Sequence, residues 1–509
     1  MGASRRKKHG EEELRAVSGY VAGLSRNQGM LLPYTLEEYV DEENPVRFID
    51  AFVDTLDLIG IGFTHSVPND EGRPPYDPRD LLKLYIYGYL NQVRTSRKLE
   101  RECHRNLEVM WLMKKLTPDF WTISEFRKQN VERIKGVFRE FVSFLQGIDL
   151  VEGKLVSLDG AKMKACNGRK RNFTKRSLEL KLKRVEEKVE KYMKELEAND
   201  EINEVEEDEE RELIRKRNDY LKAKLEKLKK SRRELEEVRR RMTEAGRNEI
   251  SLTDPESKLM KNNGKIEVCY NTELVVDRRR HIIVNYEVTN ECNDENQLAP
   301  MAKSTKEILG VEKLDVTADT GFIDSIQIKD CIENNITPYL STTKLDGSQH
   351  PGTRVPDPTS FGRVKFIYDQ KRDTYACPAG NTMTFRHIER QHGRNLRVYT
   401  TTACKTCSFM ARCTKNKQGR RITRWIHQKM IEELLERIKR EPEKLEERMK
   451  LAEHPFGTIK RALNQGYFLL KGLRKVNGEM GFTVLAYNIR RALNILGTSR
   501  LLQALSLTR

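Results

Sequence analysis

Three acidic residues in this chain have the type and setting needed to hold metal ions at a phosphodiester. Asp159 and Asp319 each close an apolar run and stand just before a glycine-containing turn, and Glu453 stands near the start of a late helical stretch. Acidic strand ends can converge at the rim of a sheet. With a helix carboxylate they could hold two Mg²⁺ ions about 4 Å apart for in-line displacement. Each carboxylate taken alone is more often a turn former or a helix cap.

Four cysteines in the second half of the chain have the spacing of a structural zinc site. Cys377, Cys404, Cys407 and Cys413 form a Cys-x26-Cys-x2-Cys-x5-Cys pattern, in which the close pair favours a tight metal-binding turn. The alternative is a set of four reduced thiols in a small β-rich subdomain. Nine cysteines in a chain of this size favour reduced thiols or metal ligands over a disulfide framework.

A basic segment in the first quarter of the chain predicts contact with a polyanion. It contains Arg94, Arg97, Lys98, Arg101 and Arg105, and a helix with such residues on one face can enter a DNA groove or contact phosphates. The formal net charge of +17 favours the same kind of partner. The alternative is an amphipathic bundle whose basic face is simply solvated.

Several longer stretches together resemble bacterial insertion-sequence transposases of the Asp-Asp-Glu (DDE) type. The resemblance is to the insertion-sequence-four-like superfamily, in a group with an N-terminal helical domain close to the eleven-eighty-two group. The stretches that carry it are Asn27–Phe63, Arg73–Lys128, Leu155–Ala165, Asp315–Phe322 and Glu453–Gly497, the last reading EHPFGTIKRALNQGYFLLKGLRKVNGEMGFTVLAYNIRRALNILG.

The resemblance implies that Asp159, Asp319 and Glu453 are the catalytic residues and bind two Mg²⁺ (or Mn²⁺) ions. The superfamily signature, a Glu followed after six residues by a Lys, falls on Glu453 and Lys460. Arg448 is the nearest match to the signature's Arg, one position out of register, and no Tyr stands where the signature has one. The implied partner is double-stranded DNA, both transposon ends and target. Arg448 and Lys460 join the DNA-binding candidates, and a homodimer is expected because two ends must be cut together.

Strand-like and helical runs between residues 155 and 341 predict a mixed α/β sheet. Expected strands are Leu155–Lys164, Lys265–Val276, His281–Thr289, Leu314–Asp319 and Thr337–Ser341, with helices near Gln297–Ile308 and Ile326–Asn334. This order suggests a ribonuclease-H-like core, in which the first and fourth strands carry the two aspartates. Asp315 is the main rival to Asp319 because it shares the same strand face. Asp319 is preferred because it lies at the strand end.

A highly charged segment, 174–247, predicts an antiparallel coiled-coil hairpin inserted into this core. Apolar residues repeat with heptad spacing on both sides of an acidic break at Asn199–Glu210, with Asn218 and Arg232 at core positions. The hairpin could serve in dimer contact, DNA contact or spacing, or it could be a solvated arm.

These patterns divide the chain into six regions. They are a basic mobile arm (1–25), a helical DNA-binding domain (26–150), a ribonuclease-H-like core (151–173 and 248–342), the coiled-coil insertion (174–247), an insertion with the possible zinc site (343–440) and C-terminal helices that complete the core (441–509).

The sequence therefore predicts a transposase that binds the ends of an insertion sequence, cleaves them by phosphoryl transfer and joins them to target DNA. Two other functions stay open: a non-catalytic DNA-binding protein descended from such an enzyme, and a structure-specific nuclease on the same fold. The chain contains neither a membrane-spanning run of 18 or more apolar residues nor a secretory signal. We expect no membrane partner and a location in the bacterial cytoplasm, with the nucleoid.

Overall fold

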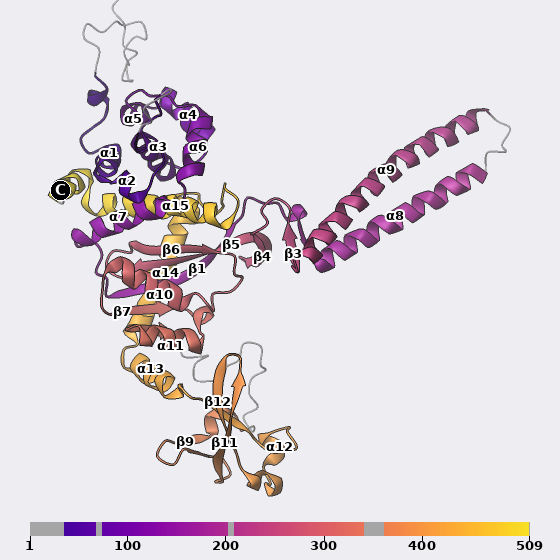
Figure 1. Cartoon of the computed structure of the whole chain (residues 1–509), viewed down its shortest axis with the longest axis vertical. Coiled ribbons are helices and arrows are strands. Elements are labelled where there is room, and N and C mark those ends of the chain that lie inside the picture. The colour runs from indigo at the N-terminus through magenta and orange to yellow at the C-terminus, as the bar shows by residue number, and fades with distance from the viewer. Residues whose placement is uncertain (1–34, 68–73, 202–207, 341–360, 508–509) are drawn as a thin grey trace, which may run out of the picture.

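The computed structural model describes residues 35–67, 74–201, 208–340 and 361–507 (Figure 1). The predicted basic arm, 1–25, and the first part of the predicted 343–440 insertion lie outside the described residues. None of the helices that the structure describes combines the length and the apolar character that crossing a membrane requires.

The N-terminal region is helical, as the sequence predicts. Most of its longer helices bury one apolar face, whereas the helix Pro78–Leu90 is buried on nearly all sides. Asn44 and Asp77 cap two of the helices by accepting hydrogen bonds from the backbone N–H groups of Val46 and Arg79. The helices are η1 (Leu36–Tyr39), α1 (Pro45–Thr55), α2 (Leu58–Ile61), α3 (Pro78–Leu90), α4 (Ser96–Arg105), α5 (Leu107–Leu112), α6 (Phe120–Asn130) and α7 (Ile134–Gly147).

The centre of the molecule is a mixed six-stranded sheet. Its main order is β6-β5-β1-β7-β8, with β4 also paired to β5; the β1–β5 and β5–β6 pairs are antiparallel, and the β1–β7 and β7–β8 pairs are parallel. This order and polarity are consistent with a ribonuclease-H-like core. The strands are β1 (Leu155–Lys164), β4 (Lys258–Asn262), β5 (Lys265–Asp277), β6 (Ile283–Thr289), β7 (Leu314–Ala318) and β8 (Ile336–Leu340), and the connecting helices are α10 (Leu298–Leu309) and α11 (Ser325–Glu333).

Four predicted strands differ from the structure by one or two residues at a boundary, and the third and fourth differ for a clear structural reason. The third strand starts at Ile283, since His281 adopts a left-handed backbone conformation (φ 57°) in the turn that follows β5. The fourth ends at Ala318, because Asp319 leaves the strand to cap the short helix η3 (Thr320–Phe322).

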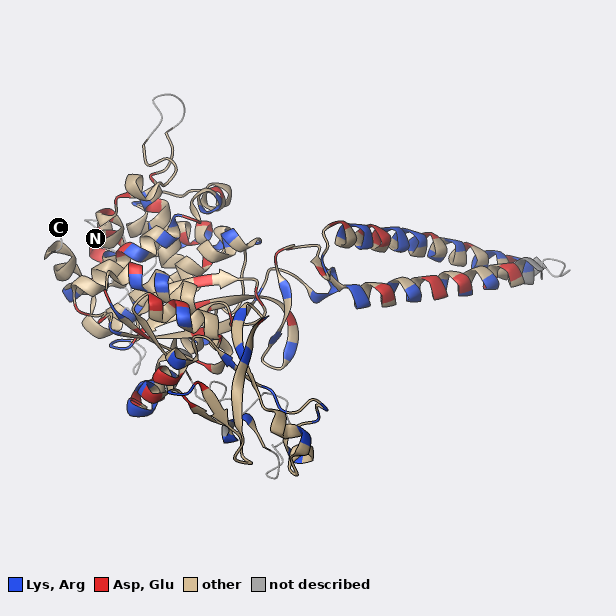
Figure 2. Cartoon of the chain, turned by 60° about the horizontal axis from the view of Figure 1, so that its bottom comes forward, with Lys and Arg blue, Asp and Glu red and all other residues tan. Residues whose placement is uncertain are grey.

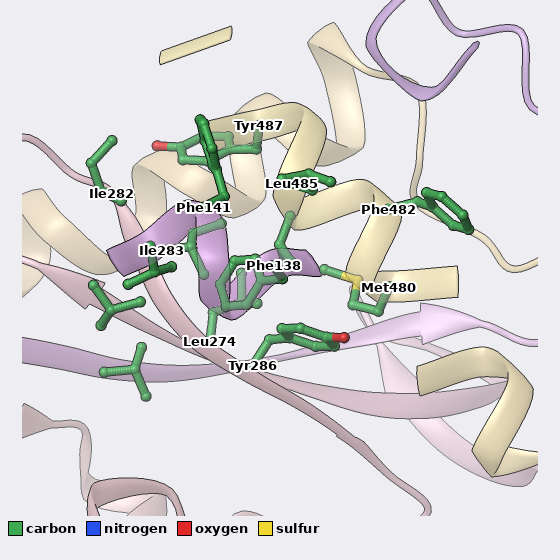
Figure 3. Close-up of a cluster of buried hydrophobic side chains, with 14 of the residues drawn as sticks. Phe138, Phe141, Leu274, Ile282, Ile283, Tyr286, Met480, Phe482, Leu485 and Tyr487 are labelled. Atoms are coloured by element: carbon green, nitrogen blue, oxygen red, sulfur yellow. The ribbon is translucent and has the colours of Figure 1, made fainter. Parts of the chain in front are cut away.

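A long C-terminal helix, α15 (Leu473–Leu496), joins the N-terminal helices to the sheet. It packs against α3, α7 and β6, and Figure 3 shows its Met480, Leu485 and Tyr487 among side chains from α7, β5 and β6. The approach to the turn between α6 and α7 is close: a Cβ on Gly478 would lie 2.0 Å from the carbonyl oxygen of Val131. One hydrophobic core therefore runs from the N-terminal helices into the sheet.

The predicted hairpin is present as two long helices that project from the sheet (Figure 1). They are α8 (Lys175–Glu201) and α9 (Asp208–Glu244), and the short strands β2 (Asn172–Thr174) and β3 (Glu249–Ser251) pair at their base. Lys and Arg alternate with Asp and Glu along both helices (Figure 2). Asn218 is buried and accepts a hydrogen bond from Asn199, at 2.7 Å. The prediction of a core position for Arg232 is wrong: its exposed guanidinium pairs with Glu186 and Glu236.

The segment after β8 forms a second, five-stranded antiparallel sheet and then returns to the core. The sheet has the order β13-β12-β11-β10-β9. Its elements are η4 (Arg363–Lys365), β9 (Ile367–Asp369), β10 (Thr374–Ala376), β11 (Thr382–Gln391), β12 (Arg394–Thr400), η5 (Thr402–Thr406), α12 (Met410–Cys413) and β13 (Ile422–Trp425). The returning elements are α13 (Gln428–Arg440), α14 (Glu443–Gly457), the π-helical η6 (Thr458–Ala462), α15 and α16 (Thr498–Leu507).

Candidate active site

The register of two parallel strands places Asp159 and Asp319 side by side. β1 and β7 pair from Leu155 with Asp315 to Leu158 with Ala318, and the next residue on each chain is the aspartate. Asp315, the rival candidate, lies at the other end of this ladder, where its Oδ2 atom is 2.7 Å from Nζ of Lys444. The structure thus brings Asp319, and not Asp315, next to Asp159.

Nearby positive charge only partly offsets the cost of ionising the Asp159 carboxylate. Burial, and then the neighbouring charge of Asp319, raise the pKa of Asp159 to about 7. Arg448 acts in the opposite direction, without restoring the usual pKa. Two adjacent carboxylates whose negative charges repel each other provide oxygen ligands that fit a divalent cation. Asp319 also accepts a hydrogen bond from the backbone N–H of Gly321 at 2.7 Å, so it caps η3 as well.

Helix α14 brings the third predicted ligand to the same part of the sheet. It packs against β1, β5 and β7 and begins at Glu443, so Glu453 lies near its end and not near its start. The backbone of Glu453 is helical, and its side chain lies outside what the structure describes.

Lys460 and Arg448 flank Glu453 in the sequence, and both act electrostatically on Asp159. Lys460 lies in the π-helical η6, a geometry often found at functional sites. It is half-buried, and burial lowers its pKa, while Cys269 and Asp159 act to raise it. A partly desolvated ammonium beside an acidic pair is well placed to bind a phosphate oxygen.

A second acidic pair, Glu273 and Asp294, adjoins the first and was missed in the sequence. Asn271 Nδ2 lies 2.6 Å from both Glu273 Oε1 and Asp294 Oδ1, and Lys162 Nζ lies 2.9 Å from Asp294 Oδ1. Burial, and then the charge of Asp294, hold the pKa of Glu273 well above its usual range. Asp294 also acts on Asp159.

The sequence contained one signal for this pair. Asn271 and Glu273 are polar residues two positions apart in β5, between the apolar runs 268–270 and 274–276, and both are fully buried. Buried polar side chains on a strand need partners, so they point to a polar cluster. Asp294 carried no such signal, because it lies in the loop between β6 and α10.

Within the described ranges of the chain, no three His, Cys, Asp or Glu side chains form a group that could hold a metal ion. The third predicted ligand, the Glu453 side chain, is not among the described atoms. The fit of a cation therefore rests on Asp159 and Asp319.

Four of the five predicted DNA-binding residues near α4 are exposed, and the fifth is not. Arg97, Lys98, Arg101 and Arg105 are at the surface of α4. Arg94 is buried, and its guanidinium donates to the carbonyl oxygens of Tyr467 (3.0 Å) and Asn464 (3.3 Å). The guanidinium of Arg94 therefore forms contacts inside the protein, whereas the sequence predicted a contact with DNA.

Replacing Asp159 with Asn is expected to stabilise the metal-free protein near pH 8 and not near pH 4. The pKa of Asp159 is about 7 in the folded protein, so the folded state keeps a proton that the unfolded chain has already released. Stability therefore falls as pH rises from about 4 to about 7, and the charged carboxylate then costs on the order of 2 kcal/mol. Thermal unfolding in EDTA across this range measures the effect. An equal shift in Tm at both ends of the range would contradict it.

Two family models match the chain. One, described as a transposase domain (DUF772), matches residues 34–129, from the start of the described N-terminal helices to α6. The other, described as a transposase DDE domain, matches residues 376–493, which include the four cysteines, Glu453 and most of α15. A comparison with curated proteins found no match, and neither did a comparison with solved structures. By these two domains, the chain is a transposase with an N-terminal DUF772 domain and a DDE domain.

Proposed function

We propose that this transposase cuts DNA at the ends of an insertion sequence and joins those ends to target DNA, with Asp159, Asp319 and Glu453 as its catalytic residues. The observation that carries the proposal is the β1–β7 register, which sets Asp159 beside Asp319. The packing of α14 against both strands supports Glu453 as the third member. Within DDE transposases we assign the chain to the insertion-sequence-four-like superfamily, close to its eleven-eighty-two group.

Asp159, Asp319 and Glu453 would hold two Mg²⁺ or Mn²⁺ ions. Such ions, when bound, supply an activated attacking oxygen and stabilise the leaving 3′-oxygen. The chain's own contribution is to orient the DNA. Lys460 and Arg448 would bind phosphate oxygens beside the acidic pair, and Lys162 holds Asp294 at 2.9 Å so that this carboxylate stays in place.

Helix α4 is tied to the active-site region, which supports a role in binding the transposon ends. The turn before α4 contacts the segment that follows Lys460: Gln92 donates to the carbonyl oxygen of Ala462 at 2.9 Å, and Arg94 donates to that of Tyr467. That segment in turn bonds to the end of β1, where the N–H of Phe468 donates to the carbonyl oxygen of Lys164 at 2.9 Å. DNA bound along α4 would therefore extend toward Asp159 and Asp319.

Replacing Arg97, Lys98 and Arg101 together with alanine is expected to weaken binding to end-bearing DNA about 10-fold or more at moderate salt and to reduce the salt dependence of binding. These side chains are exposed on α4, and removing one cation that neutralises a phosphate lowers the slope of log K against log salt by roughly one unit. Alanine favours helix, so α4 should persist. Fluorescence anisotropy at several salt concentrations measures both effects.

The matched control is a double variant at exposed lysines away from the acidic pair, Lys154→Ala with Lys313→Ala. Lys154 and Lys313 immediately precede β1 and β7, at the strand ends opposite Asp159 and Asp319. If this control reduced affinity and salt dependence as much as the α4 variant, the effect would be one of net charge and α4 would not be the binding element.

The function itself is tested by incubating the purified chain with Mg²⁺, labelled DNA carrying the element's own ends and a target plasmid, beside a Glu453→Ala variant. Cleavage at the ends and joined products, both absent with the variant, are expected. Cleavage without joining would indicate a structure-specific nuclease. Specific binding without cleavage by either protein would indicate a non-catalytic DNA-binding protein. Because two ends must be cut together, we also propose a homodimer, which light scattering with and without end DNA tests.

A further inference from the structure

The four cysteines of the second sheet converge on one small cavity. Cys377 follows β10, Cys404 lies in η5, Cys407 follows η5, and Cys413 ends α12. All four line a cavity of about 20 Å³ whose other walls are mostly apolar, including Phe366 and Met383. A space of this size takes a single water-sized body, so it suits one ion and no larger ligand.

The electrostatics of this cavity call for negative charge inside it. The four cysteines share this cavity with one cationic side chain, Arg420, which also lines it. The Nε atom of Arg420 is buried and has no hydrogen-bond partner within the described part of the chain. Its Nη1 atom donates to the carbonyl oxygen of Cys413 at 3.1 Å, which fixes the guanidinium beside the thiols. A buried, unpaired cationic donor is balanced if the thiols become thiolates.

The backbone around the cysteines has the tight turns that a thiolate site uses. In the Cys377-Pro-Ala-Gly380 turn, the N–H of Gly380 donates to the carbonyl oxygen of Cys377 (2.9 Å), and the N–H of Asn381 donates to its Sγ atom (3.3 Å). Such N–H···S bonds orient a ligating sulfur. Gly419, with φ of 100°, passes so close to Cys404 that an added Cβ would lie 2.6 Å from the Cys404 Cβ atom.

The second sheet has only a small apolar core of its own, besides Leu396 and Trp425, which join the main core. Its own buried core consists of Phe366, Tyr375, Met383, Tyr399 and Ile422. A core this small usually needs a metal or disulfides in addition. All four cysteines are free thiols in the structure.

We propose that Cys377, Cys404, Cys407 and Cys413 bind one Zn²⁺ ion as four thiolates and that this ion stabilises the second sheet. Binding replaces four S–H bonds with four Zn–S bonds and releases the thiol protons to solvent, with no oxidation or reduction. As they stand, the sulfur atoms are not a preformed ligand group within the described part of the chain, so the turns must close inward on binding. The ion is separate from the one or two that the carboxylates would hold.

The test measures zinc in the full-length protein purified without chelator, by plasma mass spectrometry. We expect about one zinc per chain, released stoichiometrically by a mercurial thiol reagent. Cys407→Ser should lower the zinc content at least about fivefold, because it removes one ligand of the close pair. Cys292→Ser, at an exposed cysteine outside the cavity, is the matched control and should retain zinc.

A second measurement covers the case in which Cys407→Ser fails to fold. Wild-type protein, stripped of metal and titrated with Co²⁺, should develop thiolate-to-cobalt charge-transfer bands and intense tetrahedral d–d bands that saturate at about one equivalent. Wild-type protein without zinc and without these bands overturns the proposal. So does equal loss of zinc in Cys292→Ser, or a native mass showing that the four cysteines are joined as disulfides. DNA cleavage is not used as a readout, so failure here leaves the proposed function untouched.

Discussion

Replacing Asp159 or Asp319 with alanine is expected to lower DNA cleavage by about 1,000-fold or more, which corresponds to roughly 4 kcal/mol less transition-state stabilisation. The two carboxylates lie side by side at the β1–β7 register, so removal of either leaves a single strand-end donor for the cations. Binding to end DNA should change little, because the exposed basic residues of α4 are untouched. Single-turnover cleavage with Mg²⁺ measures the first effect and anisotropy the second.

Asp315→Ala is the matched control for Asp319→Ala. Asp315 lies near the start of β7 and Asp319 directly follows its end, but Asp315 is paired with Lys444 at the far end from Asp159. We expect cleavage by Asp315→Ala to stay within a few-fold of wild type, with a modest loss of stability. If Asp319→Ala cut normally and Asp315→Ala did not, the second ligand would be Asp315.

Replacing Glu479 with alanine is expected to destabilise the fold by about 3–5 kcal/mol. The carboxylate is fully buried at the start of α15 and accepts the backbone N–H groups of Leu469 and Leu470, at 2.8–3.1 Å. It is also the nearby negative charge for two buried cations, Arg94 at 3.8 Å and Arg127. Alanine would leave both N–H groups without this acceptor and both cations without this negative charge. Leaving buried polar and charged groups without a partner destabilises the folded state strongly. Urea unfolding at neutral pH measures the change in the free energy of unfolding.

A surface ion pair near the same helix supplies the control. Glu132 pairs with Arg474, whose side chain is 80% exposed, so Glu132→Ala should change stability by less than about 1 kcal/mol. Glu479→Gln should fall between wild type and Glu479→Ala, because an amide oxygen can still accept from one backbone N–H. If Glu479→Ala unfolded at the same urea concentration as Glu132→Ala, the network would not hold α15 to the N-terminal helical region as the structure indicates.

Much of the fold could be predicted because its signals are local. The strand that carries Asp159 begins with a mostly apolar run, and predicted and observed bounds agree at Leu155–Lys164. The helices α8 and α9 follow from heptad spacing, which depends only on residues three and four positions apart. The mixed sheet, the helical N-terminal region and the helical hairpin are therefore confirmed.

The site could be predicted only in part. Asp159 and Asp319 could be nominated because each ends an apolar run before a turn, but their adjacency depends on strand pairing across about 160 residues, which no local pattern encodes. The assignment of Asp319, Glu453 and the four cysteines to their roles stays a prediction. Asp294 had to be found in the structure, since only the folded sheet brings its loop to Asn271 and Lys162.

The basic residues show most clearly which features depend on neighbours in the sequence and which depend on tertiary contacts. Arg94 and Arg97 look alike in the sequence, yet Arg94 is buried against Tyr467 and Glu479, while Arg97 is exposed on α4. Similarly, heptad spacing gave Asn218 and Arg232 equivalent positions, and packing buried only the shorter side chain. The sequence by itself was enough to predict many of the helices and strands, because periodicity and capping depend on residues that are close together in the chain. Only the tertiary structure decided which of these side chains contact each other and which are exposed to solvent. The reason is that burial depends on contacts between segments that are not neighbours in the sequence.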